Sequence, residues 1–229
     1  MAMIDPDMLL GAYSIGVFPM ADSRSADDVF WVEPLRRAMI PIEDFKMSRS
    51  LKKIVRSDRF TVTRDAAFSE VVRHCADRPE TWINPLLEKS YAALHELGNA
   101  HSIECWRGGR LAGGLYGVRL GPAFFGESMF SAERDASKVA LAWLVARLRH
   151  GRFKLLDCQF MTPHLKSLGA VELPQADYVA RLGELLETSR GGDFTALDAL
   201  LSSSSSSSSS STEDSSPGNL IAQLLGQTS

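Results

Sequence analysis

Cysteine is scarce in this 229-residue chain, and the three cysteines present, Cys75, Cys105 and Cys158, lie far apart with no Cys-x-x-Cys spacing. This pattern argues against a disulfide framework and against a zinc site, so we expect no metal. It suits a protein that stays in a reducing cytoplasm.

Long apolar runs are absent as well, and the N-terminal MAMIDPDMLL lacks the basic start and apolar segment of a signal peptide. We therefore expect no membrane association. The 45 % hydrophobic and 23 % charged content is that of a soluble globular protein, in one domain or in one domain plus a smaller one.

Excess charge of one sign is also lacking overall, with a formal net charge of -3, but the charge is unevenly spread. Residues Arg36 to Arg64 hold nine Lys/Arg against three Asp/Glu, and the chain from Gln175 onward is acidic. The basic segment is either a solvated face or a surface that contacts phosphates.

One stretch, Gly121 to Phe160, organises the rest of the chain. It predicts a strand over 123–130, a helix over 136–150 with Asp135 as N-cap and Gly151 at C′, and a strand over 153–160. Strand alternation then places Leu156, Cys158 and Phe160 on one face and Leu155, Asp157 and Gln159 on the other.

Three polar residues interrupt these apolar strands: Glu127, Asp157 and Gln159. Each alone is more often a structural hydrogen-bonding group than a catalytic one, because burial without partners is costly. Their convergence on one apolar region is typical of a small-molecule pocket.

Caps and turns outline the other elements. Asp5-Pro6 and Asn84-Pro85 each open a helix, Ser48 caps a short basic helix, and Asp65 caps another. The Gly108-Gly109 turn predicts a hairpin.

The fold class is α+β, with a small N-terminal domain over 1–35, a catalytic domain with a mixed, mainly antiparallel sheet over 36–187, and a tail over 188–229. Ten consecutive serines, Ser202 to Ser211, predict that this tail is disordered and unnecessary for the chemistry.

The order of these elements is that of the acetyltransferase-like (GNAT) fold. The acetyl-coenzyme A enzymes carry a glycine-rich loop before the central helix, where backbone N–H groups bind pyrophosphate. Residues 128–136 hold no glycine and two acids. This absence disfavours a small-molecule acyltransferase that uses a thioester, although that reading stays open.

Seven blocks between Leu9 and Leu185 together carry a resemblance: GVFPM, TWIN, HSIECW, GGLYGV, FFGESMFS, DASKVAL and LLDCQF. In them the chain resembles the leucyl/phenylalanyl-tRNA–protein transferase family. The resemblance implies a cytoplasmic enzyme without a cofactor, and we expect a monomer. It would transfer Leu or Phe, with Met as a third candidate donor, from aminoacyl-tRNA to the N-terminal amine of proteins that begin with Arg or Lys, marking them for N-end-rule degradation.

The resemblance also assigns roles to residues. An apolar pocket for the donor side chain would be lined by Leu115, Phe124, Met129, Leu141, Leu144, Leu148 and Leu156. Trp82 would stack near the 3′-terminal adenosine, and Met20 stands where relatives carry a second stacking tryptophan. Glu127 would bind an ammonium group.

Asp157 and Gln159 match the family's proposed catalytic pair. Asp157 would accept the amine's proton directly or by polarising Gln159, or else the enzyme mainly positions its substrates while the tRNA's 2′-hydroxyl shuttles the proton. We expect the tRNA backbone to be contacted by Arg49, Lys52, Lys53 and Arg56. A non-catalytic RNA- or peptide-binding module is the remaining alternative.

Overall fold

The computed structural model describes residues 3–45, 47–206 and 216–226. Its centre is a seven-stranded sheet in the order β4-β5-β6-β7-β8-β3-β9. Neighbouring strands are antiparallel except for β7 and β8, which are parallel. The strand bounds are β3 Arg36–Ile40, β4 Thr61–Arg64, β5 Ala100–Arg107, β6 Arg110–Leu120, β7 Ala123–Ser131, β8 Leu155–Gln159 and β9 Val171–Pro174. The mixed, mainly antiparallel sheet predicted from the sequence is confirmed.

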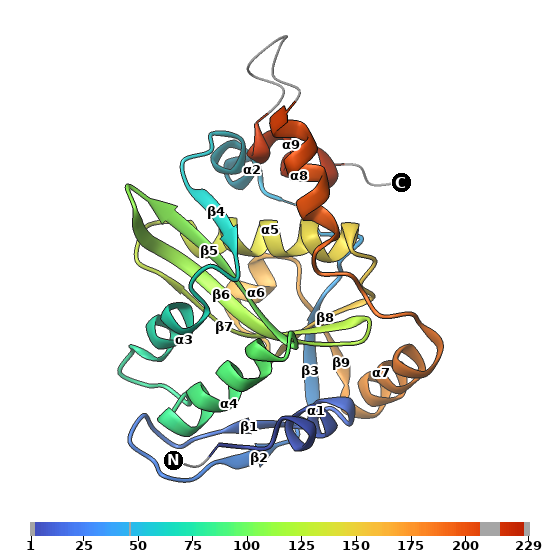
Figure 1. Ribbon diagram of the computed structural model, residues 1–229. Helices are drawn as coiled ribbons and strands as arrows, with labels where there is room; N and C mark the ends of the chain where they lie inside the picture. Colours follow the sequence, from blue (N-terminus) through green and yellow to red (C-terminus); the bar gives the residue numbers. More distant parts are fainter. Residues whose placement is uncertain (1–2, 46, 207–215, 227–229) are drawn as a thin grey trace.

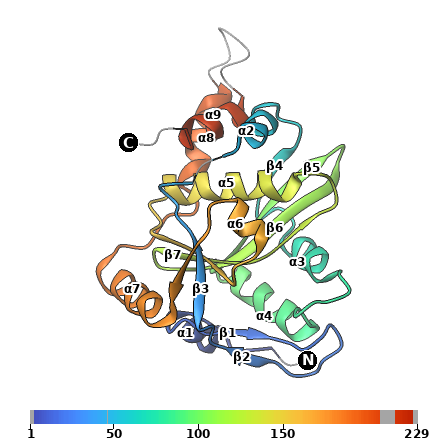
Figure 2. The same cartoon turned by 180° about the vertical axis from the view of Figure 1, so that it is seen from behind.

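Helices cover both faces of this sheet (Figures 1 and 2). Helix α5 crosses one face, where α2, α8 and α9 gather, and α3, α4, α1 and α7 pack on the other. The helix bounds are α1 Pro6–Ser14, α2 Arg49–Arg56, α3 Phe68–Ala76, α4 Pro85–Glu96, α5 Ala136–His150, α6 Pro163–Ser167, α7 Gln175–Thr188, α8 Ala196–Ser206 and α9 Pro217–Leu224. No described helix is both long enough and apolar enough to span a bilayer.

Two hydrophobic cores result, one on each side of the sheet, because successive strand residues point to opposite faces. Phe124 belongs to the core beneath α5, whereas Phe125 belongs to the core beneath α1, α3 and α4. Leu156 and Leu155 divide between the two cores in the same way. Apolar runs in β7 and β8 are therefore those of strands buried on both faces.

The N-terminal part is small and depends on the rest of the chain. It consists of α1 and the two-stranded sheet of β1 (Phe18–Met20) and β2 (Phe30–Val32). Asp5 caps α1 as predicted, accepting hydrogen bonds from the backbone N–H groups of Asp7 and Met8. Tyr13 of α1 is fully buried in the core shared with α4 and β7.

Local capping predictions were right at Ser48 and Asn84, whose side chains accept hydrogen bonds from Leu51 and Leu87. Asp135 is at the N-cap position of α5 as predicted, but its side chain accepts no capping hydrogen bond. The prediction was wrong at Asp65, because the N-cap residue of α3 is Ala67. Asp65 instead accepts from the backbone of Ser102 and contacts the ring of His101, both on the neighbouring strand.

Gly151 ends α5 but does not adopt the left-handed C′ conformation, since its φ is -77°. Glycine is needed there because a Cβ would lie 2.1 Å from the carbonyl oxygen of Asp193. Glycine is therefore required at position 151 because the backbone of the tail passes close to it.

The prediction of a disordered tail is wrong for the described residues beyond 188. Helices α8 and α9 pack on α2 and α5 and bury Leu197, Ile221 and Ala222. Asp198 of α8 forms a salt bridge with buried Arg147 of α5 at 2.7 Å. Residues 207–215, which include the second half of the serine run, lie outside the described residues.

Candidate active site

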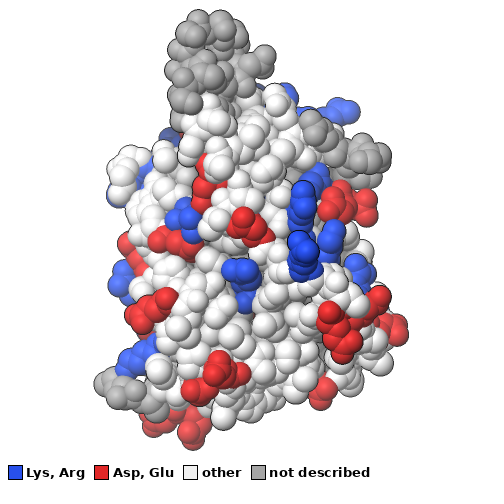
Figure 3. Space-filling model, turned by 45° about the vertical axis from the view of Figure 1, so that its right-hand side comes forward, with Lys and Arg blue, Asp and Glu red and all other residues white. Residues whose placement is uncertain are grey.

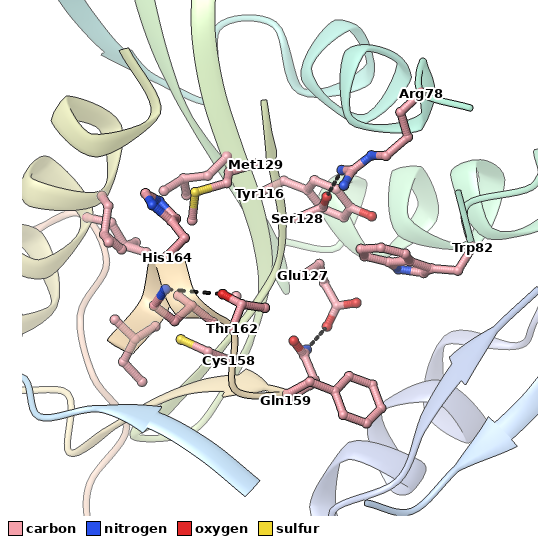
Figure 4. Close-up of a pocket in the computed structure, with 17 residues that line it drawn as sticks. Arg78, Trp82, Tyr116, Glu127, Ser128, Met129, Cys158, Gln159, Thr162 and His164 are labelled. Atoms are coloured by element: carbon pink, nitrogen blue, oxygen red, sulfur yellow. Dashed lines mark hydrogen bonds between the residues drawn. The ribbon is translucent and has the colours of Figure 1, made fainter. Parts of the chain in front are cut away.

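A pocket of about 360 Å³ opens where strands β7 and β8 separate. Their parallel pairing ends at Phe125 and Asp157, and the residues that follow in both strands line the cavity. Helix α5 supplies an apolar wall, and the short helix α6 closes another side. Trp82, which precedes α4, lies across the cavity from His164 (Figure 4).

Two irregularities in the sheet determine which side chains enter this pocket. In β7, Tyr116 pairs with Ser128 and Gly117 pairs with Gly126, so Glu127 is an extra, bulged residue. In β8, Asp157 and Gln159 pair with consecutive residues of β3, so Cys158 is extra. Bulges redirect side chains and are common beside active sites.

The bulge in β8 explains why strict alternation fails at its end. Gln159 has a φ of +56°, which is uncommon for a residue other than glycine. As a result Cys158 and Gln159 both line the pocket, while Asp157 points to the opposite side of the strand.

Glu127 is 7 % exposed and holds three hydrogen bonds. The hydroxyls of Tyr13 and Tyr91 donate to it at 2.7 and 2.8 Å, and the Gln159 amide Nε2 donates at 2.9 Å (Figure 4). Burial raises the pKa of Glu127 to about 7, and the charge of Asp157 adds to the rise, although the tyrosine hydroxyls and Arg37 oppose it. A carboxyl group with its pKa near neutrality is of the kind that general acid–base catalysis uses.

Asp157 is fully buried and bound by its own set of donors. Arg37, which is 1 % exposed, contacts Asp157 through Nε at 2.9 Å and through a terminal nitrogen at 2.6 Å. The Tyr178 hydroxyl and the Gln159 backbone N–H donate to the same carboxylate at 2.7 and 2.8 Å. The Arg37 guanidinium lies between the rings of Phe18 and Tyr178, 4.8 Å from each centroid.

This arrangement revises the predicted role of Asp157. The carboxylate does not line the pocket, and its four donors leave it no access to a substrate amine. Direct proton acceptance by Asp157 stays a prediction that this geometry does not favour. Its contact with the Gln159 backbone suits a positioning role.

Five of the seven apolar residues predicted for the donor pocket line it: Leu115, Met129, Leu141, Leu144 and Leu156. Phe124 and Leu148 do not, and that part of the prediction was wrong. Phe124 lies where β7 and β8 are still paired, and its ring stacks on Phe194 of the tail at 5.4 Å. Leu148 is one helical turn beyond Leu144, past the end of the cavity.

Trp82 lines the pocket as predicted, and its half-buried ring lies 5.0 Å from the Arg78 guanidinium. Arg78 also donates to the Ser128 hydroxyl at 2.6 Å and to the Cys75 carbonyl at 2.8 Å. Met20 is half-buried in the same hydrophobic cluster as Trp82 but does not line the cavity.

The basic segment does not form one patch. Arg37 is buried beside Asp157, and Arg59 and Arg64 are paired with acids from distant parts of the chain. Arg49, Lys53 and Arg56 are exposed on α2, and Lys52 is half-buried there. On the face seen in Figure 3, basic side chains lie among acidic ones. Among the described residues, no group of His, Cys, Asp and Glu is arranged to hold a metal.

The family model described as leucyl/phenylalanyl-tRNA protein transferase matches residues 39–183, and the model of that family's N-terminal domain matches residues 2–35. The chain belongs to the leucyl/phenylalanyl-tRNA protein transferase family. It is therefore a tRNA-dependent aminoacyltransferase, as the resemblance implied.

Two relatives named leucyl/phenylalanyl-tRNA–protein transferase match most of this chain. One from Rhizorhabdus wittichii is 58 % identical over 253 residues and covers 100 % of both chains. One from Zymomonas mobilis is 56 % identical over 206 residues, which are 86 % of this chain and 77 % of the relative. A solved structure titled "Crystal structure of FemX" superposes with a TM-score of 0.51 at 12 % identity, over 73 % of this chain and 66 % of that one. At this identity the likeness shows a shared fold alone.

Several residues of this transferase site escaped the sequence reasoning. Tyr13 and Arg37 reach Glu127 and Asp157 from 114 and 120 residues away, and no local pattern links them. The sequence indicated Arg78 only by its position shortly before the motif that contains Trp82. His164 and Thr162 line the cavity from α6 and its cap.

Proposed function

We propose that the pocket binds the leucyl or phenylalanyl group of an aminoacyl-tRNA and transfers it to the N-terminal α-amine of a protein that begins with Arg or Lys. The product would carry a destabilising N-terminal residue and be degraded by the N-end rule, in the cytoplasm where charged tRNA is found. Glu127 is the observation that carries this proposal: a carboxyl group with a pKa of about 7, buried at the polar end of an apolar cavity.

The cavity's shape supports an unbranched or γ-branched donor side chain. Leu115, Leu141, Leu144 and Leu156 present methyl groups from the sheet and from α5, and Met129 adds a flexible thioether. An apolar wall of this kind selects by fit, at about 1–3 kcal/mol per methylene. Leu, Phe and Met satisfy it without burying a polar atom.

The reaction needs one proton to move. The neutral α-amine attacks the ester carbonyl, the new C–N bond forms, the C–O bond to the terminal ribose breaks, and the amine's proton ends on the ribose oxygen. In our proposal, Glu127 takes that proton, because its pKa lies near neutrality.

Gln159 orients the attacking amine. Its amide nitrogen is committed to Glu127, so Oε1 remains as the acceptor for an amine N–H. Asp157, held by Arg37, fixes the backbone of Gln159 and thereby the direction of its side chain. Asp157 and Gln159 thus act as a pair in which only Gln159 touches the substrate.

The donor's adenosine stacks near Trp82, and α2 contacts the tRNA backbone farther from the ester. The fold is GNAT-like, a proposal that the hairpin-rich sheet and the diverging parallel pair β7 and β8 support. A domain boundary near residue 35 is supported by β3, which begins at Arg36 and belongs to the large sheet.

The test is transfer of radiolabelled leucine from charged tRNA to a model protein with N-terminal Arg, beside the same protein with N-terminal Asp. We expect label on the Arg protein alone and its loss with Glu127→Gln. Label on the Asp protein would refute the proposed acceptor class. Unchanged transfer by Glu127→Gln would refute the proposed proton acceptor.

A further inference from the structure

We infer that a hollow beside the pocket, lined by Arg24, Arg73 and Arg78, binds the phosphodiesters of the RNA 3′ end. The inference rests on the proposed function, since it concerns the same donor. It names a site for the nucleic acid separate from α2, on the other face of the sheet.

The hollow has a volume of about 380 Å³ and lies at the end of α3. Its lining residues are Arg24, Arg73, His74, Ala76, Asp77 and Arg78. Arg78 also lines the donor pocket, so a single side chain forms the wall between the two spaces. The pocket and the hollow are therefore adjacent.

The three arginines differ in their hydrogen-bond and ion-pair partners. Arg78 donates to Ser128 and to a carbonyl oxygen, and Arg24 pairs with Glu88 at 2.9 Å. Arg73 is exposed and makes no side-chain hydrogen bond or ion pair within residues 3–45, 47–206 and 216–226. A free guanidinium next to two fixed ones is suited to bidentate phosphate contact.

Acidic groups around the hollow offset only part of this charge. Asp77 contributes one carboxylate to the lining. His74 stacks on Phe130 at 4.7 Å and lies 3.8 Å from Glu70. Because Glu88 pairs with Arg24, the lining keeps Arg73 and Arg78 against Asp77, which is still an excess of positive charge. A cation in the last turn of α3 also complements the helix dipole, and the experiment below separates that structural role from phosphate binding.

Trp82 and Arg78 lie together at the border between the pocket and the hollow. The reacting ester has to face Glu127 and Gln159, while the Arg78 guanidinium lies 5.0 Å from the centroid of the Trp82 ring and donates to Ser128 (Figure 4). A base stacked at Trp82 would therefore have its phosphodiester near Arg78, which also lines the hollow. The basic helix α2 packs on α5 and α9, across the sheet from α3, and is remote from this exit (Figure 1).

The test compares two donors that carry the same ester: phenylalanyl-tRNA and 3′-O-phenylalanyl-adenosine, which has no phosphate. We expect Arg73→Gln to raise KM for phenylalanyl-tRNA about tenfold and to leave KM for phenylalanyl-adenosine unchanged. The salt dependence of tRNA binding should become shallower by about 0.7–1 in the log–log slope. Arg190→Gln, the same change just beyond α7 on the other side of the molecule, should do neither.

Three results would overturn the inference: equal losses with both donors, no loss with either, or the same loss in Arg190→Gln. The first would mean that Arg73 acts only through the structure of α3. Failure of the wild-type enzyme with both donors would be a different outcome, since it would refute the proposed function itself.

Discussion

The buried pair of Arg37 and Asp157 gives a stability prediction that depends on tertiary structure alone. Replacing Arg37 by Met keeps much of the side chain's apolar volume but leaves the Asp157 carboxylate buried without its cation. The Tyr178 hydroxyl and the Gln159 N–H remain as its only donors among the described residues.

The expected cost is large for a protein of this size. Breaking one side of a buried ion pair costs about 3–5 kcal/mol, against a total stability of about 5–15 kcal/mol. For a chain of this length each kcal/mol lowers the melting temperature by about 2–4 °C, so we expect a decrease of about 6–20 °C.

Urea unfolding followed by tryptophan fluorescence measures the effect, and a double variant tests the reason. Asp157→Asn added to Arg37→Met keeps an acceptor for Tyr178 and removes the stranded charge. The double variant should be more stable than Arg37→Met alone by about 1–3 kcal/mol. A double variant whose loss equals the sum of the two single losses would refute the ion-pair explanation.

Four further changes test the site and the fold. Glu127→Gln should remove the acid limb of the pH–rate profile. In the wild type the carboxylate form of Glu127 is lost as pH falls through about 7, so kcat/KM should fall below that pH. In the variant, kcat/KM should be low and should not change with pH in this range. Gly117→Ala places a Cβ 2.2 Å from a backbone oxygen at the β7 bulge and should destabilise the fold and lower transfer, while Gly11→Ala, with no atom within 4 Å, should not lower the midpoint of urea unfolding. Leu144→Phe should narrow the donor pocket and lower kcat/KM for Phe about tenfold more than for Leu, measured in parallel transfer assays. Deleting residues 191–229 should lower the melting temperature, because α8 and α9 cover the α5 core and pair with a buried arginine there; an unchanged melting temperature would mean that the tail is dispensable.

The sequence by itself determined the local elements and the family. Helix α5 begins and ends where its apolar spacing predicts, and the Asp-Pro and Asn-Pro pairs open α1 and α4. These signals involve neighbours within a few residues, so the chain carries them wherever it folds. Glu127, Asp157 and Gln159 were predicted to converge on one apolar region, and the structure places Glu127 and Gln159 in the lining of the pocket.

Only the tertiary structure decided which of the polar residues line the pocket. Asp157 and Gln159 are two apart, and alternation predicts one face for both, but the bulge at Cys158 separates them. The bulge arises from pairing with β3, a strand 120 residues earlier, and no local pattern encodes it. The partners of the two acids, Tyr13 and Arg37, are equally remote in sequence.

The tail shows the same division. Its serine run predicts disorder by composition, since serine buries little apolar surface. The few apolar residues on either side, Leu197 and Ile221 among them, are nonetheless sufficient to dock on a preformed surface of α2 and α5. The composition of a segment indicates how much apolar surface that segment could bury by itself. Helices α8 and α9 are stable because they bury their few apolar residues against the apolar surface of the rest of the fold.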